Sequence, residues 1–234
     1  MAGGPGSYVF GEEERKELMD VIESGYLFRY GTEGVDGFQH KVASFETELA
    51  SKLGLKHAIA TSSGTGALLC CLAALGIGAG DEVIVPGYTF IASISSIILS
   101  NAIPVLAEVD DSLTIDPTHI EELITSRTRA IMPVHMLGNP CDMDAIMKIA
   151  KKHNLYVIED CCQAFGASYK GKRVGNFGDI AAYSLNVFKT ITAGDGGAVV
   201  TNDDMLYERA FGFHDQGHKP SRMKARRCFD RLRG

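Results

Sequence analysis

Lys189 stands where an apolar run ends, five residues after Ser184 in the segment SLNVFK. Removal from water lowers the pKa of a lysine amine, and the neutral amine is a nucleophile that forms imines with aldehydes. Glycines at positions 194, 196 and 197 then lead the chain into another apolar run. A single loop lysine is usually a solvated charge, so the chemistry of Lys189 depends on what surrounds it.

Asp160 ends the apolar run at 157–160 and is followed by Cys161, Cys162 and Gln163. A carboxylate at the end of a buried strand is costly unless a cation or several hydrogen-bond donors meet it. Two interpretations therefore stand side by side: an acid that binds a ligand, and a structural aspartate that caps a turn.

A phosphate-binding turn and an aromatic side chain are the other candidates. The segment TSSGTGALL at 61–69 joins an apolar run to a helical pattern. Gly64 and Gly66 allow close backbone approach, and free N–H groups at a helix start favour phosphate. No lysine follows these glycines, so this is not a Walker loop. In the segment PGYTFIAS, Tyr88 or Phe90 could stack on a planar ring or belong to the core.

One cofactor would use all four groups. Pyridoxal 5'-phosphate (PLP) needs a lysine for its aldehyde, donors for its phosphate and an acid beside its pyridine nitrogen. An aromatic side chain over the ring completes the set. The sequence offers a candidate for each role at a predicted strand end and therefore predicts a PLP site.

The elements that must position these residues follow from the apolar pattern. Short runs alternate with helical stretches, and they are HAIATSS, DEVIVPG, IPVLAEVD, RAIMPVH, LYVIED, IAAYSL and GAVVT. Such runs, rich in Val, Ile and Ala, indicate strands buried on both faces. Strands that alternate with helices predict an α/β fold with a mostly parallel sheet. In such sheets ligands bind beyond the carboxyl ends of the strands, where all four candidates fall.

The helical stretches are amphipathic or apolar. Residues 11–24 place Leu18, Val21 and Ile22 on one face, and 40–53 form a second helix. The other stretches are ALLCCLAALG, FIASISSIILS, THIEELIT and DMDAIMKIAKKHN, the last with Asp142 as its cap. The uncharged run 89–107 predicts a buried helix and then a buried strand; Asn101 and Pro104 argue against a membrane span.

Composition excludes several classes of function. Net charge is −6, from 23 basic and 29 acidic residues, so nothing global attracts nucleic acid or anionic membrane. The six cysteines form no CxxC, which argues against a metal site and a disulfide framework. Reduced thiols and an N-terminus unlike a signal peptide favour a cytoplasmic protein.

Ordered blocks of the chain resemble the DegT/DnrJ/EryC1/StrS family of sugar aminotransferases. The blocks are GLKHAIATSSGTGAL, GDEVIVPGYTFIAS, AIPVLAEVD, AIMPVHMLGNPCDMDAI, VIEDCCQAFGASYKGKRVGNFGDIAAYSL and KTITAGDGGAVVTND, and residues 7–53 resemble the family's opening helices. The resemblance implies the large domain of PLP-dependent transferase fold type I. That domain is a three-layer, mostly parallel seven-stranded sheet flanked by helices.

The resemblance also implies roles for single residues. Lys189 would form the imine with the cofactor and later move the proton at the substrate carbon. Asp160 would pair with the pyridine nitrogen, Gln163 would contact the ring or its phenolic oxygen, and Phe90 would stack on the ring.

Three further positions would hold the phosphate by the same resemblance. They are Ser184 and the backbone of Thr65 and Gly66. Where the family often has His, this chain has Asn186, a change that we expect to be tolerated.

The implied reaction moves an amino group from glutamate or glutamine to a keto sugar, often nucleotide-linked, or to a keto-cyclitol. Related sugar dehydratases replace the cofactor lysine with His, so Lys189 favours a transaminase. The alternatives are a truncated, non-catalytic relative that binds PLP or a partner, and a nucleic-acid-binding protein, which the net charge disfavours.

Three regions are expected along the chain: an N-terminal helical arm at 1–35, a PLP-binding large domain at 36–215 and a basic tail at 216–234. The tail is either an anion- or partner-binding arm or the stub of a missing C-terminal domain, since family members continue beyond it. A homodimer is predicted, because residues 9–30 and 93–99 would otherwise leave apolar surface uncovered.

Overall fold

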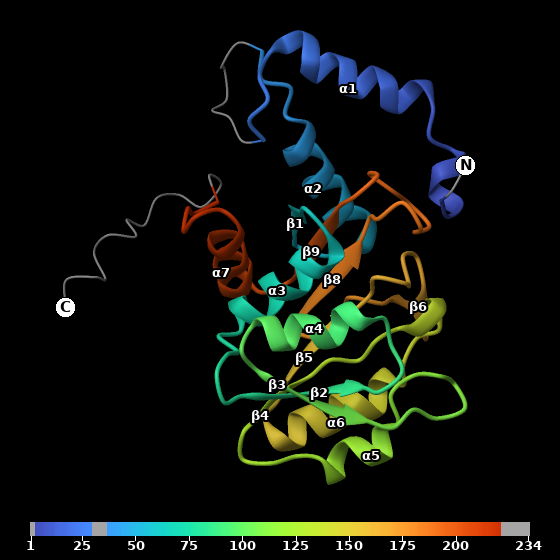
Figure 1. The fold of residues 1–234 in the computed structure, drawn as a ribbon, viewed down its shortest axis with the longest axis vertical. Coiled ribbons are helices and arrows are strands. Elements are labelled where there is room, and N and C mark those ends of the chain that lie inside the picture. The colour runs from blue at the N-terminus through green and yellow to red at the C-terminus, as the bar shows by residue number, and fades with distance from the viewer. Residues whose placement is uncertain (1–2, 30–36, 221–234) are drawn as a thin grey trace, which may run out of the picture.

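A seven-stranded sheet forms the centre of the protein in the computed structural model, which describes residues 3–29 and 37–220 (Figure 1). Its strands, in chain order, are β1 (His57–Thr61), β2 (Glu82–Pro86), β3 (Ile103–Ala107), β4 (Thr128–Ile131), β5 (Tyr156–Asp160), β8 (Ile180–Ser184) and β9 (Gly197–Thr201). Their order in the sheet is β1-β9-β8-β5-β4-β2-β3. Only β9 runs antiparallel to its neighbours among these pairs. Each predicted strand is confirmed, and so is the mostly parallel sheet.

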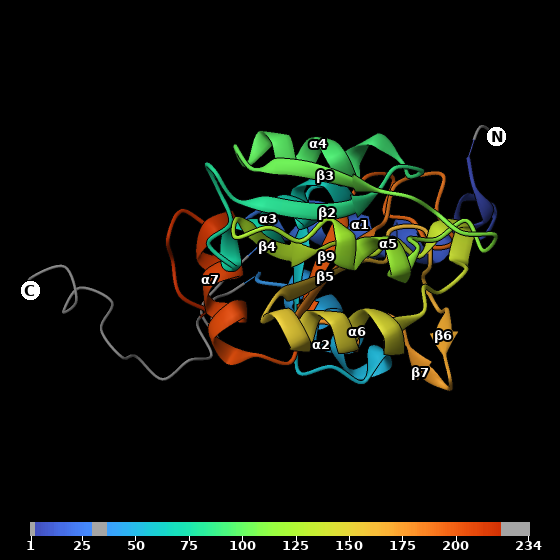
Figure 2. The same ribbon diagram turned by 90° about the horizontal axis from the view of Figure 1, so that it is seen from below.

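Helices cover both faces of the sheet (Figure 2). They are α1 (Glu12–Ser24), α2 (Lys41–Leu53), α3 (Gly64–Ala74), α4 (Ile91–Leu99), α5 (Pro117–Glu122), α6 (Met143–His153) and α7 (Asp204–His214), with short 3-10 turns η1 (Pro5–Tyr8) and η2 (Met136–Gly138). Leu68 and Leu72 of α3, Ile97 of α4 and Phe211 of α7 pack in one cluster against the sheet.

The opposite face is covered by α2, α5 and α6. Leu49 and Leu53 of α2 pack against Tyr183 of β8, and Ile146 of α6 packs in the cluster that contains Val157 of β5. The predicted three-layer α/β architecture is therefore confirmed.

Local sequence signals explain the ends of several helices. The predicted cap of α6 is confirmed, because the Asp142 carboxylate accepts a hydrogen bond from the Ala145 N–H. The prediction contained neither α7 nor the small hairpin of β6 (Ser168–Tyr169) and β7 (Lys172–Arg173). Helix α7 begins after Asp203, whose side chain accepts from the N–H groups of Met205 and Leu206. That capping aspartate was the available signal.

The prediction of a buried helix and a buried strand over 89–107 is wrong in its burial. Helix α4 buries Ser93, Ser96 and Ile97, whereas Leu99 is 64% exposed. Strand β3 is the edge of the sheet, and its Leu106 is 53% exposed. An edge strand has a neighbour on one side only, so apolar character alone did not reveal which strand would be central.

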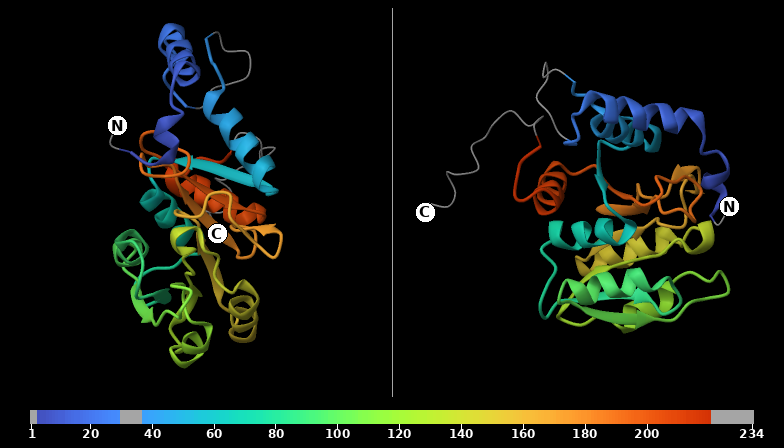
Figure 3. Two further views of the ribbon diagram at one scale, coloured as in Figure 1. Left: turned by 90° about the vertical axis from the view of Figure 1, so that its right-hand side faces the viewer. Right: turned by 45° about the horizontal axis from the view of Figure 1, so that its top comes forward.

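Helix α1 stands away from the sheet and contains no buried residue (Figure 3). Its Leu18 and Ile22, predicted on one face, are 57% and 62% exposed. Most of the basic tail, residues 221–234, lies outside the described residues. Within the part of the chain that is described, no helix combines the length and apolar character that crossing a membrane requires.

Candidate active site

A pocket of about 480 Å³ opens at the carboxyl ends of the parallel strands. Six of the seven predicted site residues line it, namely Thr65, Phe90, Asp160, Gln163, Ser184 and Lys189. They lie at the ends of four strands, β1, β2, β5 and β8, or in the loops and helices that follow them. Ser63, Gly64, Leu68, Ala92, Ser93, Cys162, Asn186, Phe188 and Asp195 line the rest of the pocket.

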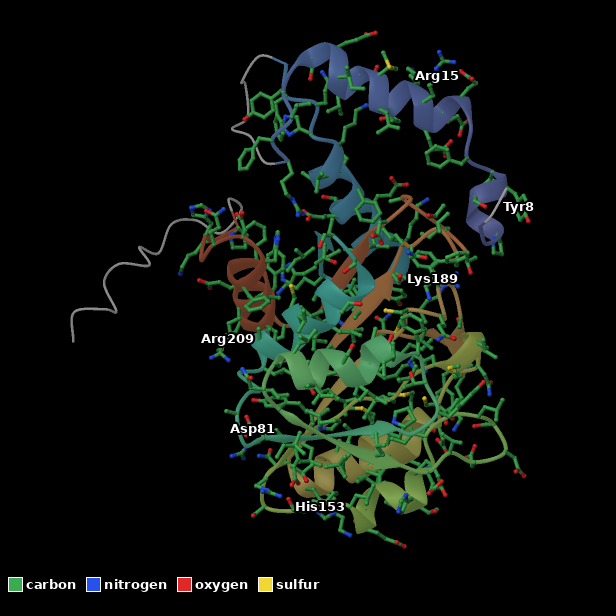
Figure 4. All side chains as sticks on the ribbon, viewed as in Figure 1. Tyr8, Arg15, Asp81, His153, Lys189 and Arg209 are labelled. Atoms are coloured by element: carbon green, nitrogen blue, oxygen red, sulfur yellow. The ribbon has the colours of Figure 1, made fainter. Side chains whose placement is uncertain are left out.

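Lys189 lies in the loop between the neighbouring strands β8 and β9, on the side of the molecule where Tyr8 lies (Figure 4). Its Nζ atom is 5.9 Å from the centroid of the Phe90 ring. Asn186 shapes this loop: its carbonyl accepts from the Lys189 N–H at 2.9 Å, and its side-chain oxygen accepts from the Phe188 N–H at 3.2 Å. Asn186 thus supports the turn that carries the lysine.

Asp160 ends β5 and is only 3% exposed. Its Oδ1 accepts from the Cys162 N–H at 3.0 Å, and its Oδ2 accepts from the Ser93 hydroxyl at 2.7 Å. An ionised carboxylate offers about four lone-pair positions, so these two donors leave acceptor capacity for a ligand. Ser93 Oγ also lies 2.9 Å from Thr89 Oγ1, which extends the chain of hydroxyl groups.

Gln163 is oriented by a backbone group. Its Oε1 accepts from the Leu137 N–H at 3.1 Å, and this assignment leaves the side-chain NH₂ group to act as a donor. Leu137 has a φ of 52°, in the left-handed region that residues other than glycine rarely adopt. Such backbone strain is often found at functional sites.

The start of α3 and Ser184 are held together by close contacts. A Cβ on Gly64 would lie 2.7 Å from the Ser184 Cβ, and a Cβ on Gly197 would lie 2.7 Å from the Gly64 nitrogen. Only glycine fits at these two positions without displacing backbone or Ser184. The TSSGTG and GDGG turns therefore consist largely of small residues, since β8, β9 and α3 meet here.

Gly66 differs from the other predicted residues. It is absent from the residues that line the pocket, and its N–H donates to the Ser63 hydroxyl at 2.9 Å, which caps α3. The first N–H groups of a helix have no intrahelical partner. Those of Gly64 and Thr65 are therefore the first-turn donors nearest the pocket lining.

Ser93 is the functional candidate that the sequence interpretation missed. It is 1% exposed and touches the Asp160 carboxylate, but in the sequence it was only one of several serines in an apolar run. A serine on the buried side of an apolar helix requires a hydrogen-bond partner, which was the available signal. Asp195 was missed as well; its Oδ1 accepts from the Gly196 N–H at 3.1 Å.

Cys162 lines the pocket without being a reactive thiolate. Burial, together with the neighbouring Asp160 carboxylate, raises the pKa of its thiol well above the usual range. A neutral thiol is a poor nucleophile, so Cys162 is a weak nucleophile candidate in this pocket.

A second polar cluster lies on the other side of β5. Ligand atoms of His135, Glu159 and Cys161 are within 4.8 Å of one another. The Glu159 oxygens already accept from three backbone N–H groups and from His135, and burial raises the pKa of Cys161 to about 12. Because the Glu159 oxygens are already occupied by these four donors, we interpret this cluster as structural.

A larger hollow of about 560 Å³ lies between α2 and α7. Its charged groups are paired with one another, since Lys56 and His57 both contact the Asp204 carboxylate. It contains no arrangement comparable to Lys189 with Asp160.

The chain matches the model of the DegT/DnrJ/EryC1/StrS aminotransferase family over residues 10–232. It is 49% identical over 206 residues to the GDP-perosamine synthase of Escherichia coli O157:H7, covering 88% of this chain and 54% of the relative. It is 42% identical over 195 residues to the L-glutamine:2-deoxy-scyllo-inosose aminotransferase of Micromonospora echinospora, covering 82% and 46%.

The fold is also similar to that of a solved aminotransferase structure. An aminotransferase from Psychrobacter cryohalolentis superposes with a TM-score of 0.84 at 44% identity, over 90% of this chain and 52% of that one. The chain thus spans about half the length of the relatives that it matches. As its ordered motifs predicted, this protein belongs to the DegT/DnrJ/EryC1/StrS aminotransferase family.

Proposed function

We propose that this chain contributes the cofactor site of a PLP-dependent aminotransferase. The observation that carries the proposal is that Lys189, Asp160 and the start of α3 meet in one pocket. The groups there match what PLP requires: an amine, a buried carboxylate with acceptor capacity, first-turn helix N–H groups and an aromatic ring. When bound, PLP supplies an electron sink for the carbon that gains or loses the amino group.

Each side chain then has a task at a stated atom. Lys189 Nζ would bind the cofactor aldehyde and would later move a proton at the substrate carbon. Asp160 would accept the hydrogen bond of the pyridine N–H and so keep that nitrogen protonated. Gln163 would donate from its NH₂ group to the phenolic oxygen, while Phe90 would cover the ring.

Ser184 and the start of α3 would hold the phosphate. A helix N-terminus favours anions because its N–H groups and its dipole both point at the ligand. Thr65 supports this role directly as part of the pocket lining. Gly66 would contribute only by exchanging its bond with Ser63 for a phosphate oxygen.

The proposed reaction transfers an amino group from glutamate or glutamine to a keto sugar or keto-cyclitol. The name of the relative with 49% identity supports a nucleotide-linked keto sugar, and the name of the relative with 42% identity supports a cyclitol. We favour the nucleotide-linked sugar on the higher identity. The regions that we propose are the arm at 1–35, the PLP-binding domain at 36–215 and the tail at 216–234 as the start of a further domain.

We also propose a homodimer in the cytoplasm. Helix α4 exposes Ile91, Ile98 and Leu99 by 65%, 56% and 64%. The edge strand β3, which contacts α4, exposes Ile103 and Leu106 by 40% and 53%. Contiguous exposed apolar surface marks a protein interface. The five described cysteines are free, which supports a reducing compartment. Light scattering after size exclusion tests the dimer, and a monomer would contradict it.

Borohydride reduction followed by mass spectrometry tests the cofactor site. We expect the mass of reduced PLP on the peptide that contains Lys189, and loss of that mass in Lys189→Ala. The matched control is Lys148→Ala, an exposed lysine of α6, which should keep the label. An unlabelled Lys189 peptide in the unaltered chain would reject the proposal. In a separate, unreduced sample loaded with PLP, visible absorbance that persists after glutamate is added would indicate PLP binding without transamination.

A further inference from the structure

The N-terminal segment lies along the loop that carries Lys189 (Figures 1 and 3). The Gly4 N–H donates to the Val187 carbonyl at 2.9 Å, and the Gly6 N–H donates to the carbonyl of Lys189 itself at 3.1 Å. Two backbone hydrogen bonds therefore connect the first residues of the chain to the proposed catalytic loop.

Glycine is required at both contact points. A Cβ on Gly4 would overlap the carbonyl group of Phe188 and lie 2.8 Å from its Cα. A Cβ on Gly6 would lie 2.9 Å from the Ile191 Cα and 2.9 Å from the Thr190 oxygen. Real Cβ atoms do not approach backbone so closely, so any side chain here would push the two segments apart. The segment GGPG thus has glycine, with no side chain, at the two positions that bond to the loop.

The segment is itself held in shape. Pro5 opens the 3-10 turn η1 and fixes its own φ angle, while Ser7 donates from its hydroxyl to the Gly4 carbonyl at 2.8 Å. Gly6 and Ser7 are buried, although the segment contains no large apolar anchor at these positions. A short, stiff turn of this kind transmits its position to whatever it is bonded to.

The loop has little apolar packing of its own. Phe188 is 67% exposed and Ile191 is 37% exposed, so burial of apolar side chains does not anchor it. Hydrogen bonds restrain it instead: the turn bonds to Asn186, the bonds from Ala193 and Thr192 to the Leu185 carbonyl at the base of the loop, and the bonds from Gly4 and Gly6 near its tip. Loops with few buried contacts open locally at low free-energy cost.

We infer that residues 3–8 act as a clasp that positions Lys189. The inference rests on the proposed role of Lys189 as the cofactor lysine. Gly4 and Gly6 are positioning residues in this account: they touch neither substrate nor cofactor and act through the backbone of residues 187–191. The clasp keeps the lysine carbonyl in place while its side chain reacts at the pocket.

Hydrogen–deuterium exchange on the full chain without cofactor tests the clasp. Gly4→Ala and Gly6→Ala should each speed exchange in the peptide covering 185–193 by about tenfold, because a Cβ at either position forces the segments apart and the unrestrained loop opens more often. The matched control is Gly11→Ala, in the same N-terminal segment, where a Cβ would meet nothing closer than 4.0 Å. Exchange at wild-type rates in both clasp variants would overturn the inference. Deletion of residues 1–8 gives a second, independent variant.

Cofactor binding supplies the second readout. We expect the clasp variants to bind PLP about tenfold more weakly than Gly11→Ala, with a smaller fraction reduced onto Lys189. Faster exchange with unchanged PLP affinity would overturn the positioning role. If the unaltered chain takes up no PLP on Lys189, the proposed function fails and the positioning role fails with it. The exchange comparison then still decides whether residues 3–8 restrain the loop. Circular dichroism melts confirm that each variant is folded.

Discussion

Glu159 and Asp160 are consecutive buried acids of β5, yet the surroundings of their carboxylates differ. Side chains alternate across a strand, so the two acids face opposite sides of the sheet. Glu159 is fully buried, and its oxygens accept from the N–H groups of Gly175, Phe177 and Gly178 at 2.7 Å each. The His135 Nε2 atom lies 3.1 Å from the same carboxylate.

The tautomer of His135 provides the fourth hydrogen-bond donor to the Glu159 carboxylate. His135 Nδ1 accepts from the Cys141 N–H at 3.1 Å, so Nε2 carries the proton that is donated to Glu159. Four donors thus saturate Glu159, whereas Asp160 meets two. A saturated buried carboxylate holds loops together, and an unsaturated one facing a pocket can bind a ligand. Counting donors therefore separates a structural acid from a functional one.

The largest expected effect is the loss of stability when Glu159, the carboxylate with four donors, is replaced. Glu159→Gln replaces one acceptor oxygen with an NH₂ group, which leaves two buried donors facing donors. We expect the free energy of unfolding to fall by about 3 kcal/mol, since each unsatisfied buried group costs about 1–3 kcal/mol. Urea denaturation measures it. Glu122→Gln, at an exposed position of α5, should change stability by less than about 0.5 kcal/mol. Equal stability of the two variants would contradict the comparison.

Replacement of Asp160, the carboxylate with two donors, is expected to change stability less and to weaken PLP binding. Asp160→Asn keeps the acceptor for the Cys162 N–H, and the Ser93 hydroxyl can turn to accept from the new NH₂ group while donating to Thr89. We expect PLP to bind about tenfold to a hundredfold more weakly, the value of a hydrogen bond to a charged group. Absorbance titration with PLP measures this, beside the exposed control Asp111→Asn. If Asp160→Asn is as unstable as Glu159→Gln and still binds PLP normally, the two roles are reversed.

Ser93→Ala should have the smallest effect. It removes one donor from the Asp160 carboxylate and leaves the Cys162 N–H in place. A neutral donor is worth about 1 kcal/mol, so PLP affinity should fall by up to about fivefold. Ser95→Ala on the same helix is the matched control, since the Ser95 hydroxyl reaches only the Ala92 carbonyl at 3.5 Å. Identical PLP affinities in both variants would show that the Cys162 N–H alone orients Asp160.

Much of the fold was predictable because strand and helix patterns are local. The apolar runs located all the strands of the main sheet, and Asp142 marked the start of α6. The exposed faces of α4 and β3 were not predictable, because a strand's neighbours are set by contacts distant in sequence. Ser93 escaped for the same reason: its partner is 67 residues away.

The sequence alone determined the family, the order of the elements and the residue types that a PLP site needs, since these are written in local spacing and ordered motifs. Only the tertiary structure decided how many hydrogen-bond donors each acid of β5 meets, which serine supports Asp160 and which glycines touch the lysine loop. The physical reason is that these hydrogen-bond donors and close backbone contacts come from segments that are distant in sequence and meet only after the sheet has formed.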